Sequence, residues 1–172
     1  MLGDVHGGAG EQCLEMIQKV QELLDQGGLL EESVSEEIAN HRQTKGKYIP
    51  GFGHRFHKPE DPRAPRLMKL VSDAEGEKIV NGNFMRIGLE IQRQLSQGKS
   101  TGIAMNIDGA TAVIFGELGF APPLARGLFC LSRSVGILAH AWEQKNQGGR
   151  NKGPTPPEFL WNYSGKNPLE EG

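Results

Sequence analysis

Apolar residues recur every three to four positions along most of the chain, which is the spacing of one face of an α-helix. The first series contains Leu14, Ile17, Val20 and Leu24, and a pair of glycines ends it. No stretch shows a convincing alternation of apolar and polar residues, the pattern of a half-buried strand. The pattern therefore predicts an all-α fold, with helices at about 9–25, 33–45, 64–79, 84–97, 107–118 and 122–145.

Several residues predict where these helices begin and how closely they pack. Ser33 followed by Glu36 has the form of a capping box, so we expect the second helix to begin there. The third helix should loosen near Gly76. Small residues in the fifth helix, Gly109 among them, predict close approach by neighbouring elements. Beyond Gly148 the composition changes to an extended tail.

Composition excludes several classes of function. A chain of 172 residues suffices for one domain with a sizeable core, and a formal net charge of -2 argues against nucleic-acid or membrane-surface partners. Cys13 and Cys130 lack the spacing of a zinc site, so we expect no metal and two reduced thiols. No apolar run approaches the length of a membrane span, and Met1 begins no signal-peptide pattern. We therefore expect a soluble, cytoplasmic protein.

The richest candidate chemistry lies in the segment 51–63, Gly-Phe-Gly-His-Arg-Phe-His-Lys-Pro-Glu-Asp-Pro-Arg. Its glycines allow the backbone to approach a ligand closely, and its prolines keep the segment out of a regular helix. His54 follows the Gly-Phe-Gly turn, where an imidazole N–H can donate to an oxyanion. Arg63 ends the segment, where a planar guanidinium can bind a carboxylate. The segment therefore predicts a ligand-binding loop.

This loop resembles the signature of the citrate synthase family, which includes methylcitrate synthases and citryl-CoA lyases. Three further segments resemble the family in the same order: Gly-Asp-Val-His-Gly-Gly at 3–8, Asn-Ile-Asp at 106–108 and Leu-Ser-Arg-Ser-Val-Gly at 131–136. Phe56 departs from the family, which usually has Ile or Val there. The resemblance implies a C-terminal portion of a longer enzyme. It divides the chain into a large-domain end and hinge (1–7), a small helical domain (8–119) and a C-terminal large-domain part with its tail (120–172).

The resemblance also implies roles for individual residues in a reaction that joins acetyl-CoA to oxaloacetate. Asp108 corresponds to the base that removes a proton from the acetyl methyl group. His6 corresponds to the donor at the thioester oxygen, and His54 to the donor at the ketone or hydroxyl of the second substrate. Arg63, Arg133 and Arg150 correspond to cations that bind substrate carboxylates, and the family contributes the last of them from the partner subunit.

The same resemblance predicts where CoA binds. It implies that the chain binds acetyl-CoA or CoA as a substrate and holds no covalent cofactor. The stretch before His54 matches the family segment that contacts the adenine, and two lysines occupy positions suited to phosphates. The predicted CoA-binding residues are Tyr48, Ile49, Gly51, Phe52, Gly53, Lys58 and Lys99.

Each assignment has a simpler structural alternative. Asp108 could cap the helix that follows it, and His6 could be a hydrogen-bonded group in a turn. Arg63 could pair with Asp61 on the surface, where such a bond contributes under about 1 kcal/mol. Arg133, if buried on its apolar helix, would need an acidic partner or a ligand. The two lysines could be solvated surface charges.

Three functions follow from these patterns. The first is a citrate synthase-type enzyme that forms citryl-CoA through an enolate. The second is a citryl-CoA lyase that runs the same chemistry backwards, favoured by the Arg-Phe-His-Lys run at 55–58 and the Gly-rich tail. The third is a truncated, non-catalytic module that binds CoA. The resemblance implies a homodimer for the full-length protein.

Overall fold

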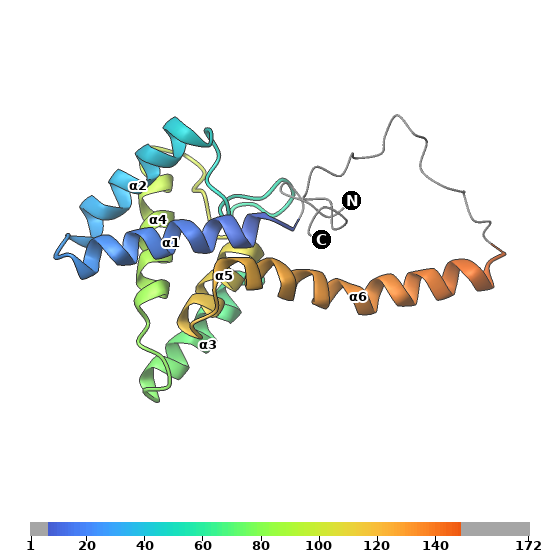
Figure 1. The fold of residues 1–172 in the computed structure, drawn as a ribbon. Helices are drawn as coiled ribbons and strands as arrows, with labels where there is room; N and C mark the ends of the chain where they lie inside the picture. Colours follow the sequence, from blue (N-terminus) through green and yellow to red (C-terminus); the bar gives the residue numbers. More distant parts are fainter. Residues whose placement is uncertain (1–6, 149–172) are drawn as a thin grey trace, which may run out of the picture. The chain divides into compact units, whose positions relative to one another are not determined.

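The computed structural model describes residues 7–148 of the chain. This part contains six helices and no strand: α1 (Ala9–Asp25), α2 (Leu30–Thr44), α3 (Ala64–Gly76), α4 (Asn83–Ser96), α5 (Ile107–Glu117) and α6 (Pro122–Asn146). The all-α prediction is therefore confirmed (Figure 1). The chain divides into two compact units, 1–134 and 135–172, and the site described below lies in the first. The predicted boundary at 119 between the small and large domains stays a prediction.

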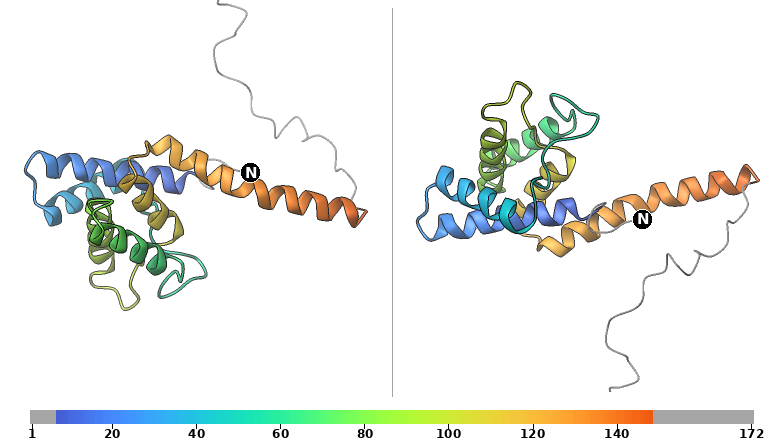
Figure 2. Two further views of the ribbon diagram at one scale, coloured as in Figure 1. Left: turned by 90° about the horizontal axis from the view of Figure 1, so that it is seen from below. Right: turned by 90° about the horizontal axis from the view of Figure 1, so that it is seen from above.

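α1 is the central helix of the first unit. It forms an antiparallel hairpin with α2 and also packs against α4 and α5, while α3 packs against α5 (Figures 1 and 2). Its buried side chains are those of the predicted apolar face, with Leu14, Ile17 and Val20 fully covered. The first turn of α6 is fixed to α1 by an ion pair between Arg126 and Glu11. The 3.6-residue spacing thus identified the face that forms the core.

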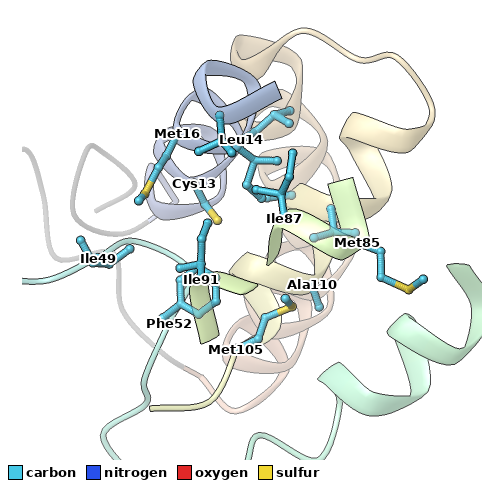
Figure 3. Packing of buried hydrophobic residues seen from close by; sticks show 14 of the residues in the cluster. Cys13, Leu14, Met16, Ile49, Phe52, Met85, Ile87, Ile91, Met105 and Ala110 are labelled. Atoms are coloured by element: carbon cyan, nitrogen blue, oxygen red, sulfur yellow. The ribbon is translucent and has the colours of Figure 1, made fainter. Parts of the chain in front are cut away.

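The core reaches down to the segment that the sequence singled out (Figure 3). Phe52 from the loop and Met105 before α5 pack with Cys13, Ile91 and Ala110 in one buried cluster. Loop and helices therefore share a single hydrophobic core, which holds the loop backbone in a defined position.

Small residues allow α4 and α5 to approach closely, as predicted for α5. A methyl group added at Gly88 would lie 2.8 Å from the Met105 side chain and 2.9 Å from that of Val113. One added at Gly116 would collide with the ring of Phe84. These contacts are far shorter than an ordinary carbon–carbon contact, so neighbouring side chains would have to shift if either glycine were replaced.

Two details of the predicted helices are wrong. α2 begins at Leu30, three residues before the expected capping box, because Leu29 is the extended residue before the helix and Leu30 packs on the core. Ser33 is therefore buried inside the helix and caps nothing. Glu31 and Glu32 occupy the first turn, where acidic groups interact favourably with the helix dipole. α3 ends at Gly76, where the sequence did predict a loosening, and does not extend to Ile79, which is exposed.

Candidate active site

Residues 51–53 of the loop lie antiparallel to residues 104–106, which lead into α5. Phe52 and Met105 form an isolated β-bridge at the centre of this pairing. Backbone N–H···O bonds of 2.7 and 3.0 Å, one in each direction, close it on either side. The pairing brings two predicted motifs together, the one that carries His54 and the one that carries Asp108.

Two glycines make this approach possible. Gly51 has φ +83°, a backbone conformation that residues other than glycine rarely adopt. A methyl group there would lie 2.8 Å from the Cα of Gly109. A methyl group on Gly109 would in turn collide with the carbonyl oxygen of Gly51 and lie 2.8 Å from the Met105 side chain. The loop therefore rests directly on the first turn of α5, backbone against backbone.

Asn106 ties the two motifs together through its side chain. Its Nδ2 donates to the carbonyl oxygen of Gly53 at 2.7 Å, and its Oδ1 accepts from the N–H groups of Asp108 at 2.9 Å and Gly109 at 3.2 Å. The residue is 9% exposed and is the N-cap of α5. One amide group thus fixes the residue before His54 and the residue predicted as the base.

His54 is half-buried, and its ring is held by its own loop. The Nδ1 atom accepts hydrogen bonds from the backbone N–H groups of Phe56 at 3.1 Å and His57 at 3.0 Å. An imidazole nitrogen that accepts carries no proton, so the proton of the neutral ring lies on Nε2. His54 therefore has the tautomer in which Nε2 is a donor, as its predicted role requires.

Arg63 does pair with Asp61, but this is no surface ion pair between two solvated groups. Arg63 donates from Nε at 2.9 Å and from Nη2 at 2.8 Å to the two oxygens of Asp61, and the Asp61 side chain is 1% exposed. The guanidinium, helped by backbone N–H groups, holds the pKa of Asp61 well below its usual range. A buried carboxylate thus fixes one edge of the Arg63 guanidinium, while 46% of the Arg63 side chain is exposed.

Asp108 lies in the first turn of α5 and is half-buried. The structural alternative for Asp108 is wrong, because Asn106 and not Asp108 provides the side-chain cap. Burial raises the pKa of the Cys13 thiol, and the charge of Asp108 raises it further. Hydrogen bonds to Asp61 raise the pKa of Arg63, and the charge of Asp108 raises it further. The Asp108 carboxylate is therefore close enough to interact with both the core thiol and the exposed guanidinium.

Beside the loop lies a cleft of about 810 Å³. It is lined by six of the seven residues predicted to bind CoA, and His54 also lines it. The seventh, Gly51, lies beneath the cleft in the backbone pairing. Leu95 from α4 and the segment 101–103 complete the wall. The six predicted residues that line the cleft are Tyr48, Ile49, Phe52, Gly53, Lys58 and Lys99.

Three further cations line this cleft that the sequence did not single out, namely Arg42, Lys47 and Arg55. Lys47 immediately precedes the predicted adenine-binding stretch and Arg55 follows it after His54, and that proximity was the available signal. Arg42 gives no such signal, because it comes from the last turn of α2 and reaches the cleft only through the fold. Together with the two lysines they make the cleft strongly basic.

The remaining predicted residues do not join this cluster in the described part of the chain. Arg133 is exposed on α6, where its guanidinium lies 4.4 Å from the centre of the Phe129 ring, so the argument from its burial does not hold. His6 and Arg150 lie outside the described residues. Within residues 7–148 no group of acidic, histidine or cysteine side chains could hold a metal ion, and no helix has the length and apolarity needed to span a membrane.

Comparison with known proteins agrees with the arrangement. The family model for the citrate synthase C-terminal domain matches residues 1–154. The chain therefore belongs to the citrate synthase family, and the resemblance stated from its motifs is confirmed.

Individual relatives show how much of an enzyme this chain represents. A citrate synthase of Acidithiobacillus ferridurans is 31% identical over 157 residues, which cover 90% of this chain but 38% of that protein. The structure is similar to that of citryl-CoA lyase from Hydrogenobacter thermophilus, with TM-score 0.67 and 30% identity over 96% of this chain and 60% of that one. It is also similar to citrate synthase from Thermotoga maritima, with TM-score 0.64 and 28% identity over 99% of this chain and 44% of that one. The chain thus spans less than two thirds of the length of each of these relatives.

Proposed function

We propose that this chain is the C-terminal part of a citrate synthase-type acyltransferase that condenses acetyl-CoA with oxaloacetate through an enolate and citryl-CoA. The observation that carries the proposal is the bridge made by Asn106 between the carbonyl before His54 and the N–H of Asp108. Through a hydrogen bond that spans 53 positions of sequence, it joins the segment of an imidazole donor to that of a carboxylate base, beside a basic cleft. A capped helix alone would not need that bridge.

The reaction needs a base, two donors and cations. Asp108 removes a proton from the acetyl methyl group, and His6 donates to the thioester oxygen as the enolate forms. His54 donates from Nε2 to the ketone of oxaloacetate while the new carbon–carbon bond forms. A carboxylate is a weak base, so most of the acceleration comes from fixed positions and oriented donors. Arg63, with Arg133 and Arg150, binds the substrate carboxylates.

The basic cleft holds CoA. The flat adenine ring lies against the backbone and side chains of residues 48–53, and the phosphates meet the surrounding cations. Five of these line the cleft, which matches a ligand that carries several negative charges. The thioester end then extends past His54 toward α5. Acetyl-CoA enters as a substrate, and water then cleaves the thioester bond of citryl-CoA to release citrate and CoA, so no covalent cofactor is required.

Cleavage of citryl-CoA is the second candidate function. It uses the same residues in reverse, with Asp108 returning a proton to the acetyl carbon as the carbon–carbon bond breaks. The similarity to the Hydrogenobacter thermophilus citryl-CoA lyase, at 30% identity over 96% of the chain, favours it specifically. A cytoplasmic location, expected from the sequence, and a homodimeric full-length protein, implied by the family, belong to the proposal in either direction.

Two measurements test the proposal. CoA at a hundred times its dissociation constant should raise the melting midpoint by about 5–10 °C, since a ligand bound only to the folded state stabilises it by about 2.7 kcal/mol. Lys58→Ala should weaken this response, whereas Lys69→Ala should not, because Lys69 pairs with Asp73 on the exposed face of α3. CoA release from acetyl-CoA plus oxaloacetate, measured beside cleavage of citryl-CoA, then distinguishes synthase from lyase.

The outcomes separate the candidate functions. If the chain binds CoA but turns over neither acetyl-CoA plus oxaloacetate nor citryl-CoA, both enzymatic functions are contradicted and a CoA-binding module remains. If CoA does not raise the melting midpoint, or if the Lys58→Ala and Lys69→Ala variants respond to CoA equally, the cleft is not the CoA-binding site.

A further inference from the structure

Asp61 is buried at the end of a run of exposed residues. It is 1% exposed, whereas its neighbours from Arg55 to Glu60 all lie at the surface. Among the described residues it and Glu37 are the buried acidic side chains. Burying a carboxylate costs free energy unless hydrogen bonds and an opposite charge offset it, so the partners of Asp61 explain why it is there.

Those partners belong to two different elements. One oxygen, Oδ1, accepts from the backbone N–H of Arg63 at 3.1 Å and from its Nε at 2.9 Å. The other, Oδ2, accepts from Nη2 of Arg63 at 2.8 Å and from the N–H of Ile107 at 3.1 Å. Ile107 is the first residue of α5 and immediately precedes Asp108. One carboxylate therefore ties the Arg63 guanidinium to the helix turn that carries the proposed base.

The geometry leaves one edge of Arg63 available. A guanidinium has five N–H donors in a rigid plane, and Asp61 takes Nε and one N–H of Nη2. The edge formed by Nη1 and the second N–H of Nη2 points away from that carboxylate. This edge matches the two oxygens of a second carboxylate. The buried pair therefore orients Arg63 without occupying the face that would bind an anion.

We propose that Asp61 is a positioning residue, which sets the distance between the carboxylate-binding edge of Arg63 and the base Asp108. This inference rests on the function proposed above. A dicarboxylate such as oxaloacetate, gripped through Arg63, is then held at a fixed place relative to α5. Asp61 touches neither substrate nor reacting atoms, and acts through Arg63 and the N–H of Ile107.

The cleft supplies a built-in comparison. None of Asp61, Arg63 and Ile107 lines it, so a change at Asp61 should affect the keto acid and spare CoA. Asp61→Asn keeps the size of the side chain and removes its charge. We expect it to weaken oxaloacetate binding, and to raise the corresponding KM, by on the order of tenfold to a hundredfold, the effect of misplacing a substrate group by about 1 Å. CoA binding and the KM for acetyl-CoA should stay unchanged.

Glu37→Gln is the matched control. It neutralises the other buried carboxylate, which contacts Lys19 and Asn40 on α1 and α2. It should leave the affinity for both ligands unchanged, because neither Glu37 nor its partners lie in the site. A parallel loss in the two variants would mean general destabilisation and would overturn the positioning role.

The wild-type chain supports a second measurement, which does not depend on whether Asp61→Asn folds. The Nε proton of Arg63 and the amide proton of Ile107 should exchange slowly with solvent in nuclear magnetic resonance spectra, while the Nε proton of the exposed Arg66 exchanges fast. Equal exchange at the two arginines would overturn the proposal. If the wild type binds oxaloacetate and Asp61→Asn binds it equally well, the positioning role is wrong and the proposed function is unaffected. No oxaloacetate binding by the wild type would instead overturn the proposed function itself.

Discussion

Asn106→Ala removes one small side chain and should destabilise the fold more than its size suggests. The substitution deletes the acceptor for the N–H groups of Asp108 and Gly109, and the donor to the carbonyl of Gly53. All three groups lose their partner in a region from which Asn106 largely excludes water. The variant therefore tests whether the loop and α5 are joined as the hydrogen bonds indicate.

The magnitude follows from the two halves of the amide. Loss of an N-cap acceptor costs about 1 kcal/mol, within a range of about 0.5–2. Leaving a buried carbonyl without its donor costs about 1–3 kcal/mol. We therefore expect Asn106→Ala to lower the free energy of unfolding by about 2–4 kcal/mol. Asn106→Asp should lose only part of this, because a carboxylate still caps α5 but cannot donate to Gly53.

Urea denaturation followed by far-ultraviolet circular dichroism measures the difference directly. The control is Asn81→Ala, which removes a single exposed hydrogen bond, donated by the backbone N–H of Asn83 to Oδ1 of Asn81. A loss in Asn106→Ala no larger than in Asn81→Ala would refute the reasoning. Equal losses in Asn106→Ala and Asn106→Asp would show instead that the cap contributes nothing and that only the donor matters.

Two further substitutions test the packing and the titration of the same unit. Gly109→Ala should lower the free energy of unfolding by about 1–3 kcal/mol, because the added methyl group collides with the loop backbone. The control Gly127→Ala adds a methyl group in open space on α6 and should be neutral or stabilising by up to about 1 kcal/mol. If urea denaturation finds Gly127→Ala to be the more destabilised variant, the packing described here is wrong. His41 donates from Nε2 to the carbonyl of Tyr48, and burial holds its pKa below the usual 6.5 with a further lowering from Lys45. The unfolded chain then binds the proton more readily, so stability should fall as pH drops below about 6.5, and His41→Gln should flatten that slope in pH-dependent melting curves. An identical slope in both proteins would rule out His41 as its source.

Most of the fold could be predicted because helical spacing is local. The apolar face of α1 and the small residues of α5 each depend only on residues that are close together in the sequence. The start of α2 was missed because Ser33 and Glu36 have the letters of a capping box at a position where Leu30 had already joined the core. Burial of an apolar side chain outweighed the local capping signal.

The site was predictable only as far as motifs reach. His54, Asp108 and the residues around Phe52 could be named from the resemblance, and most of the CoA set does line one cleft. The roles of Asn106 and Asp61 could not be named, because their partners lie 53 and 46 positions away along the chain. A sequence shows which polar groups exist, whereas the fold decides which of them meet.

The pairing of residues 51–53 with 104–106 has a consequence for how the chain acquires its chemistry. Helical turns form locally within about a microsecond, but this pairing needs two distant segments to find each other, and such non-local contacts slow folding. A chain that has regained all its helices is therefore not yet a chain with a working site. Conversely, a brief opening of this short pairing would disrupt the site while leaving the circular dichroism signal of the helices unchanged.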